Sequence, residues 1–180
     1  MFKKMKPISI RPVGDVKQAV VSCLLEKLPF VFNRQVSLLE PMRIPAESFS
    51  GYRGQYLSAG ILKELLRGAP DSRSKMLGIT EVDIFVPIFT YVFGYAQLNG
   101  TAAVISTFRL NPENSGNERD NGLLCRRILK EAVHELGHTF GLVHCTEPGC
   151  VMVFANNILE VDEKGYEFCP SCMETFLTSD

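Results

Sequence analysis

Apolar side chains in the first half of the chain switch repeatedly between alternating and helical spacing. Alternation predicts strands, and recurrence at every third or fourth position predicts helices with one buried face. The predicted elements are, in order, a strand around 8–13, a helix over 15–28, a strand over 30–39, a helix over 56–66 and a strand over 75–87. We expect Asp15 to cap the first helix. This interleaving indicates an α/β fold.

A hairpin and a long helix follow. Residues 91–96 and 101–108 are apolar runs of strand type joined through Asn99-Gly100, a dipeptide that favours a tight hairpin turn. The predicted sheet is therefore mixed and contains an antiparallel pair. The polar stretch 111–120 predicts a surface loop, and 122–141 predicts a long helix with its apolar positions on one side.

The overall composition is that of an ordinary globular protein. The chain has 180 residues, of which 46% are hydrophobic and 22% charged, and its net charge is -1. This length suits a single domain that buries about 70% of its unfolded surface. The charge gives no electrostatic case for binding nucleic acid or an anionic membrane. Residues 1–6 carry lysines but no signal segment follows them, and no run approaches the roughly 18 apolar residues of a membrane span. We therefore expect a cytoplasmic monomer.

All three histidines of the chain lie between His134 and His144. Residues four apart on a helix point to the same side, so His134 and His138 can direct their imidazoles at one ion, with Glu135 beside it. A third ligand ten positions after the first would lie about 15 Å further along a continuing helix. The helix must therefore stop, and Gly141 can adopt the left-handed conformation that ends helices and lets His144 return to the metal.

These residues suit a catalytic zinc. Three neutral imidazoles leave a tetrahedral zinc with one open position for water. The metal would lower the pKa of that water towards about 7, and Glu135 could take its proton and pass it to the leaving amine of a peptide bond. The alternative is that His134 and His138 are ordinary histidines of an amphipathic helix. The glycine and the third histidine are two further constraints that argue against it.

Four of the six cysteines follow directly, as two close pairs. Cys145 and Cys150 form the first pair, and Cys169 and Cys172 form the second. Two such pairs suit a structural zinc bound by four thiolates. The ion would rigidify a C-terminal segment whose apolar content is too small for a core of its own. Disulfides, buried thiols, or a redox pair at Cys169 and Cys172 are the alternatives.

The remaining cysteines and one methionine need separate interpretations. Cys23 and Cys125 fall on apolar faces of predicted helices, so we expect two packed, inert thiols. Met152 lies among valines shortly after the third histidine and would, taken alone, be a core residue. Taken with the histidines, it occupies the place of the methionine turn that lies beneath the zinc in metzincins.

Together these motifs resemble the archaemetzincins, a family of metzincin-type zinc metallopeptidases. The match covers 134–172, about a fifth of the chain, and is highly specific. A softer similarity extends over 83–94. The matching positions are His134, Glu135, His138, Gly141, His144, Cys145, Cys150, Met152, Phe154, Asp162, Lys164, Phe168, Cys169 and Cys172.

The resemblance implies a compact metzincin-like α/β domain over 1–180. Residues 1–141 would form an α/β subdomain with the active-site helix, and 142–180 a small C-terminal subdomain with the methionine turn and a zinc staple. Two zinc ions are implied, a catalytic one on the histidines and a structural one on the four cysteines. The substrates would be peptides or proteins.

The resemblance also suggests how substrate binds. In metzincins an extended peptide adds to an antiparallel edge strand above the cleft. Some members stabilise the oxyanion with a tyrosine two residues after the turn methionine, a position that Phe154 fills here. Tyr166 and Lys164 are candidates for this donor, with a solvated loop position as the alternative for each. The candidate edge strand, for which a buried hairpin strand is the alternative, is Tyr91, Val92, Phe93, Gly94, Tyr95 and Ala96.

Three functions are compatible with the sequence. The first is an active zinc peptidase, either an endopeptidase or an aminopeptidase. The second is a zinc-bound module that binds peptide or protein without turnover, and Glu135 favours the first, since a binder needs no general base. The third is redox or zinc sensing through Cys169 and Cys172. An aminopeptidase would need an acidic group for the free amine of its substrate, and the candidates are Glu81, Asp83, Glu113 and Glu118.

Overall fold

The computed structural model describes residues 6–69 and 74–179. The sequence predicts no targeting signal at residues 1–6, and most of this segment, residues 1–5, lies outside the described range. The strands are β1 (Ile8–Pro12), β2 (Val36–Leu38), β3 (Phe49–Ser50), β4 (Gln55–Leu57), β5 (Lys75–Thr80), β6 (Ile84–Phe85), β7 (Gly94–Ala96) and β8 (Ala102–Ser106). The helices are α1 (Gln18–Phe32), α2 (Ser58–Arg67), α3 (Asn121–Thr139), α4 (Ile158–Glu163) and α5 (Pro170–Thr178), with short 3₁₀ turns η1 (Ala46–Ser48) and η2 (Pro112–Ser115). None of the helices in the described ranges combines the length and apolar character needed to cross a bilayer.

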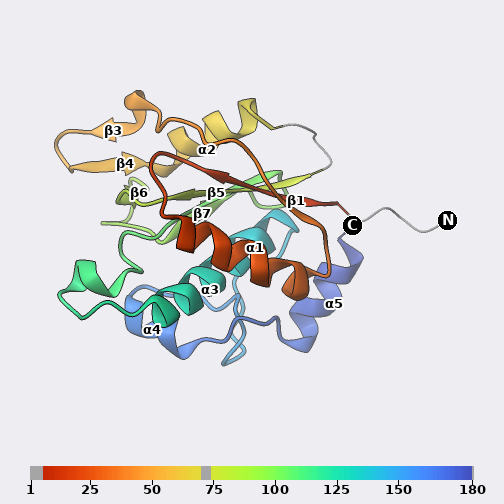
Figure 1. Ribbon diagram of the computed structural model, residues 1–180. Coiled ribbons are helices and arrows are strands. Elements are labelled where there is room, and N and C mark those ends of the chain that lie inside the picture. Colours follow the sequence, from red (N-terminus) through yellow and green to blue (C-terminus); the bar gives the residue numbers. More distant parts are fainter. Residues whose placement is uncertain (1–5, 70–73, 180) are drawn as a thin grey trace.

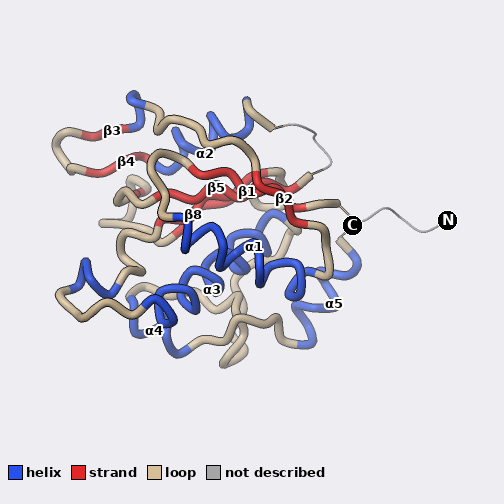
Figure 2. The backbone as a smooth tube through the Cα atoms, viewed as in Figure 1, coloured by secondary structure: helices blue, strands red, loops and turns tan. Residues whose placement is uncertain are grey.

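The strands form two sheets (Figure 2). The larger sheet has five strands in the order β2-β1-β5-β8-β7, and the smaller one has the order β3-β4-β6. In the larger sheet β2, β1, β5 and β8 are parallel, whereas β7 pairs antiparallel with β8 and forms one edge. The expected α/β fold with a mixed sheet and an antiparallel edge strand is confirmed.

Helices cover both faces of the larger sheet (Figure 1). Helices α1 and α3 lie on one face and α2 on the other. The central strand β5 shows how this divides the core, because all of its residues are buried. Leu77 and Ile79 pack with α1 and α3, and Met76 packs with α2. A strand covered on both sides reads as a continuous buried run, which is why alternation is weak there.

Helix α1 differs from its predicted bounds at both ends. It starts at Gln18, and Asp15 does not cap it. The carboxylate of Glu81 instead accepts a hydrogen bond of 2.7 Å from the backbone N–H of Lys17. At its other end the helix continues through Pro29 to Phe32, so the strand predicted over 30–39 shrinks to β2.

The extension of α1 has a packing cause. A proline inside a helix removes one hydrogen bond and costs about 3 kcal/mol or more. The extra turn brings the ring of Phe32 within 5.6–6.0 Å, between ring centroids, of Phe140, Phe168 and Phe176. Burial of this aromatic cluster offsets the cost of the proline.

Other boundaries shift in a similar way. The helix predicted over 56–66 begins with strand β4 before α2, and the strand predicted over 75–87 divides into β5 and β6 of different sheets. The hairpin of β7 and β8 is confirmed, with Asn99 in the left-handed region at φ 52°. Residues 91–93 precede the strand, so the expected edge strand is shorter than predicted.

The prediction of two inert thiols at Cys23 and Cys125 is wrong, because these cysteines form a disulfide. Their Cα atoms lie 5.9 Å apart, within the range that a disulfide spans. The bond joins α1 to α3, which pack against each other. The two cysteines are 102 residues apart in sequence, so nothing local indicates that they meet.

The C-terminal segment packs under α3 and is tied to it by charge. The guanidinium of Arg127 in α3 donates two hydrogen bonds, of 2.7 and 2.6 Å, to the carboxylate of Asp162 in α4. Lys130 donates to the backbone carbonyls of Val161 and Asp162. Phe168 and Phe176 join the core cluster of the main sheet. The segment therefore shares the core of the protein.

Two phenylalanines on α1 test the role of the aromatic cluster. Phe32 is 2% exposed and Phe30 is 85% exposed. We expect Phe32→Ala to lower the free energy of unfolding by about 3–5 kcal/mol, because it leaves a cavity between α1, α3 and α5. Phe30→Ala, the matched control, should change it by less than about 0.5 kcal/mol. Equal effects in urea unfolding would contradict this account of the helix extension.

Candidate active site and cysteine cluster

The end of helix α3 sets the geometry of the candidate site. The carboxylate of Asp120 caps its start by accepting a hydrogen bond of 2.8 Å from the backbone N–H of Leu123. At the other end Gly141 has a φ of 90°, in the left-handed region. The N–H of Gly141 donates to the carbonyl of His138, and that of Leu142 donates to the carbonyl of Gly137. This is the hydrogen-bond pattern of a Schellman motif, which reverses the chain after the helix.

The reversal brings the three histidines together. One ligand atom of each of His134, His138 and His144 lies within 4.8 Å of the others. The Nε2 atoms of His134 and His138 are 3.1 Å apart. Their Nδ1 atoms lie 2.8 Å from the carbonyl oxygens of Val151 and Leu142, respectively. Because a carbonyl can only accept, Nδ1 carries the proton in both rings and Nε2 is left with a free lone pair.

The protonation of these rings also suits metal binding. Burial lowers the pKa of His134 well below its usual value, and the nearby positive charge of Lys164 lowers it further. Burial likewise lowers the pKa values of His138 and His144. Neutral imidazoles are the form that binds a transition metal. Three of them with convergent lone pairs match the donor set of a catalytic zinc.

Glu135 lies beside this cluster with its side chain buried. Burial raises the pKa of its carboxyl well above the usual value, the charge of Glu131 raises it further, and Lys164 lowers it. A Cβ atom added at Gly94 would lie 2.4 Å from Cγ and 2.6 Å from Oε1 of Glu135. The carboxylate therefore lies directly against the edge strand β7, where only glycine leaves room for it.

A cleft of about 770 Å³ opens over these residues. The histidines and Glu135 line it, together with the whole of residues 91–96 and the preceding loop 86–90. Phe154 lies across the cleft from the loop, with its ring centroid 4.9 Å from that of His144 and 6.1 Å from that of Phe89. Most of the remaining lining is apolar. The expected strand and the histidines thus face one cavity.

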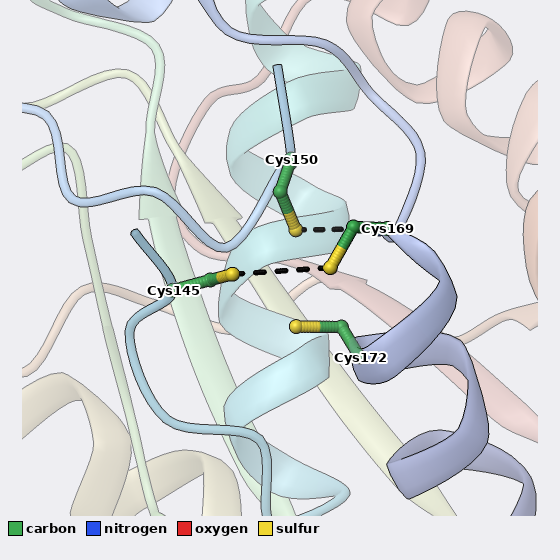
Figure 3. A group of neighbouring side chains, drawn as sticks. All are labelled: Cys145, Cys150, Cys169 and Cys172. Carbon is green, nitrogen blue, oxygen red and sulfur yellow. Dashed lines mark hydrogen bonds between the residues drawn. The ribbon is translucent and has the colours of Figure 1, made fainter. Parts of the chain in front are cut away.

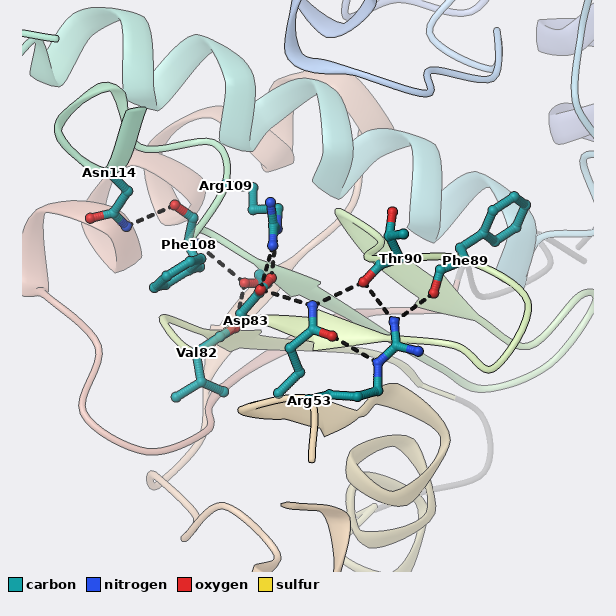
Figure 4. Close-up of polar contacts among 10 residues, drawn as sticks. Arg53, Val82, Asp83, Phe89, Thr90, Phe108, Arg109 and Asn114 are labelled. Carbon is teal, nitrogen blue, oxygen red and sulfur yellow. Dashed lines mark hydrogen bonds and ion pairs between the residues drawn. The ribbon is translucent and has the colours of Figure 1, made fainter. Parts of the chain in front are cut away.

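A polar network holds the loop that forms one wall of this cleft (Figure 4). Asp83 accepts two hydrogen bonds, of 2.8 and 2.7 Å, from the guanidinium of Arg109. Arg53 donates to the backbone carbonyls of Phe89 and Thr90. The guanidinium of Arg109 also lies 4.1 Å from the centre of the Tyr91 ring. These contacts fix the path of the chain as it enters the edge strand.

Met152 is fully buried and lies against α3 at Gly137. A Cβ atom at Gly137 would lie 2.6 Å from the sulfur of Met152. Gly137 stands between the first two histidines on the helix, so its lack of a side chain allows the turn to pack directly against their backbone. The backbone N–H of Cys145 donates a hydrogen bond of 2.9 Å to the carbonyl of Met152, which closes the turn.

The four C-terminal cysteines converge beside this turn (Figure 3). Cys145 and Cys150 flank the loop after His144, and Cys169 and Cys172 lie at the start of α5. The four sulfur atoms lie within 4.8 Å of one another. None of the four is in a disulfide. Four sulfurs at this separation match the donor set of a tetrahedral structural zinc.

The donor candidates named for the oxyanion do not reach the cleft. Tyr166 is exposed and does not line it. The alternative for Lys164, a position on a solvated loop, is also wrong, because its side chain is buried behind His134. The reason is that α4 ends at Glu163 and directs the next residue inward, under the methionine turn.

The four acidic side chains considered for an amine-binding role also lie outside the cleft. Glu81 pairs with Lys17 and Asp83 with Arg109. Glu113 and Glu118 belong to the η2 region and the loop after it, away from the histidines. Besides Glu135, the acidic residue that lines the cleft is Glu131, which the sequence motifs do not identify. The signal that could have identified it is its position one helical turn before Glu135.

Comparison with known proteins places the chain among peptidases. A sequence model described as Peptidase family M54 matches residues 15–177. The archaemetzincin of Methanocaldococcus jannaschii is 41% identical over 167 residues, which cover 93% of this chain and 90% of that protein. The archaemetzincin of Pyrococcus furiosus is 38% identical over 172 residues, which cover 92% and 90%.

Solved structures give the same answer. The archaemetzincin of Archaeoglobus fulgidus, crystallised with malonate, superposes with a TM-score of 0.83 at 37% identity and covers 94% of this chain and 99% of that one. A zinc-dependent peptidase of Methanocorpusculum labreanum gives a TM-score of 0.86 at 30% identity, with 94% and 99% coverage. Both sequence and fold match over almost the whole length. The chain therefore belongs to the archaemetzincins of peptidase family M54 and is a zinc metallopeptidase, an enzyme that acts on peptides or proteins.

Proposed function

We propose that this peptidase binds its catalytic zinc through His134, His138 and His144 and uses Glu135 as general base. The observation that carries the proposal is the convergence of three neutral imidazoles and one buried carboxylate in a single cleft beside an edge strand. Zinc bound there would supply a Lewis acid and an acidified water. Glu135 would take the proton of that water and deliver it to the leaving amine.

The edge strand β7 would position the substrate. Its inner edge pairs with β8, and its outer edge has no partner strand within the described sheet. An extended peptide can add to such an edge through backbone hydrogen bonds. Gly94 places the bound backbone next to Glu135. The apolar side chains along the cleft, among them Phe89 and Phe154, favour apolar residues around the cleaved bond.

The carboxylates of the cleft favour internal cleavage over trimming from the amino end. Among the described lining residues only Glu131 and Glu135 are acidic. Glu135 has the role of base, and Glu131 forms an ion pair with Lys164. Neither is free to bind the amine of a substrate terminus. An endopeptidase is therefore the form of the activity that we propose.

A second zinc would be structural. Cys145, Cys150, Cys169 and Cys172 would bind it and join the loop after His144 to α5. The protein would then hold two zinc ions per chain, one for each donor cluster. A single domain over 1–180, a monomeric state and a cytoplasmic location complete the proposal and stay predictions.

The role of Glu135 is tested by profiling cleavage of a proteome-derived peptide library by mass spectrometry. We expect Glu135→Ala to retain zinc and to lose about 10²-fold or more in rate, because the other carboxylate that lines the cleft, Glu131, is held in an ion pair with Lys164. Glu174→Ala removes an exposed acid of α5 and should cleave as wild type does. Wild-type products that persist in Glu135→Ala would exclude this base. Cleavage within peptides would support the endopeptidase form.

The two metal sites are tested by counting zinc in purified protein by elemental mass spectrometry. We expect about two ions in the wild type and about one in His138→Ala and in Cys169→Ser, since either change removes one donor from one cluster. Cys169→Ser should in addition lower the melting temperature, because the cysteine zinc carries folding free energy. A wild-type count of about one would contradict the two-site proposal.

Gly94 tests the contact between the edge strand and the base. We expect Gly94→Ala to lower kcat by about 10-fold or more, because the new methyl group displaces the Glu135 carboxylate while leaving the zinc count unchanged. A Cβ atom at Gly51 meets no atom within 4 Å, so Gly51→Ala is the matched control and should keep full activity. If Gly94→Ala is as active as this control, the carboxylate does not need its observed position.

A further inference from the structure

A fully buried ion pair lies directly behind the histidine cluster. The ammonium of Lys164 is 2.8 Å from Oε1 of Glu131, and both side chains are almost completely buried. Burying two charges is costly because both lose their hydration, and the fold does not need them there for packing alone. Apolar residues of similar size would fill the same space. A charge pair retained next to a metal site calls for an explanation at that site.

Lys164 contacts two segments that build the site, α3 and the methionine turn. Besides Glu131 of α3, its ammonium lies 3.4 Å from Nδ1 of His134 and 3.4 Å from the carbonyl oxygen of Val153, in the methionine turn. Lys164 itself follows the end of α4. Oε1 of Glu131 receives no hydrogen bond of good geometry within the described structure. The ammonium is therefore the charge partner on which this oxygen depends.

Lys164 does not reach the cleft, and Glu131, which lines it, is only 3% exposed and is engaged by Lys164. Lys164 approaches His134 from the Nδ1 side, whereas the convergent ligand atoms of His134 and His138 are the Nε2 atoms on the opposite side of the rings. The imidazole of His134 stands between the ammonium and any ion held by the three histidines. Lys164 and Glu131 thus have the geometry of positioning residues.

We propose that Glu131 and Lys164 form a charge-balanced pair that holds His134 in place and keeps the protein behind the catalytic zinc electrically neutral. The inference rests on the proposed function, because it assumes that the three histidines bind zinc. Alone, the ammonium would repel a divalent cation on the far side of the ring. The carboxylate of Glu131 cancels that repulsion. Alone, the carboxylate would be a buried charge without a partner one turn before Glu135 on α3, and the ammonium compensates it.

The signs of these effects make the proposal testable through zinc affinity. The affinity of the histidine site is measured by zinc competition against a chelator, with the cysteine site kept loaded. We expect Glu131→Gln to raise the Kd at least about tenfold, because it leaves an uncompensated positive charge near the ion. Lys164→Met leaves a negative charge or a neutral acid and should not raise the Kd. The double variant Glu131→Gln/Lys164→Met should return to within about threefold of wild type.

Two further measurements separate this role from simple structural support. Both single variants should melt at a lower temperature than the double variant, because each leaves one buried charge without its partner. In Lys164→Met, kcat should fall more than KM rises. The reason is that the uncompensated carboxylate of Glu131 lies one helical turn from the base Glu135, whereas the peptide-binding edge of β7 is unchanged. Glu26→Gln, which alters the exposed ion pair with Lys27, is the control and should change neither quantity.

Shifts of the Kd in the same direction in both single variants, or a double variant as weak as Glu131→Gln, would overturn the proposal. The first result would assign the pair to packing, and the second would show that the charges do not compensate each other. Failure of the proposed function would look different. In that case the wild type itself would bind no zinc beyond the cysteine site, which would overturn the proposed function and this inference together.

Discussion

The structure depends on one geometric constraint: three histidines on a single stretch of chain must reach one ion. Two of them lie one turn apart on α3, and the third cannot reach the same point unless the helix ends at once. Gly141 provides that end through its left-handed backbone, and the hydrogen bonds of Gly141 and Leu142 to the last turn close it. The carbonyl of Leu142, freed by this turn, then fixes the ring of His138. The end of the helix thus creates both the third ligand and the support for the second.

Residues 142–179 contain two short helices, α4 and α5, and no strand of either sheet, so their position must come from contacts elsewhere. They obtain it from three sources: the cysteine cluster, the packing of Met152 against Gly137, and the aromatic cluster shared with Phe32 of α1. The disulfide between Cys23 and Cys125 joins α1 to α3, the two helices against which the C-terminal segment packs. The site is therefore built between the main sheet and the C-terminal segment, and both must be in place before its ligands converge.

Much of the candidate site and part of the fold can be predicted from short sequence motifs. The spacing of the histidines, the glycine and the cysteines indicates the metal clusters, because ligand geometry constrains sequence spacing directly. The Asn99-Gly100 turn likewise predicts the hairpin that ends in the edge strand. The failures share a different cause. The extension of α1 past Pro29, the disulfide and the buried position of Lys164 all depend on segments that are distant in sequence, and no short window contains the partner that decides them.

The proposed function depends on zinc bound at the two donor clusters. The most direct measurement is X-ray diffraction from crystals of the zinc-loaded protein at wavelengths on either side of the zinc absorption edge. We expect two anomalous peaks, one between the imidazoles of His134, His138 and His144 and one among the four cysteine sulfurs. A single peak at the cysteines, with the imidazoles turned away from one another in the zinc-loaded crystal, would contradict the proposed function.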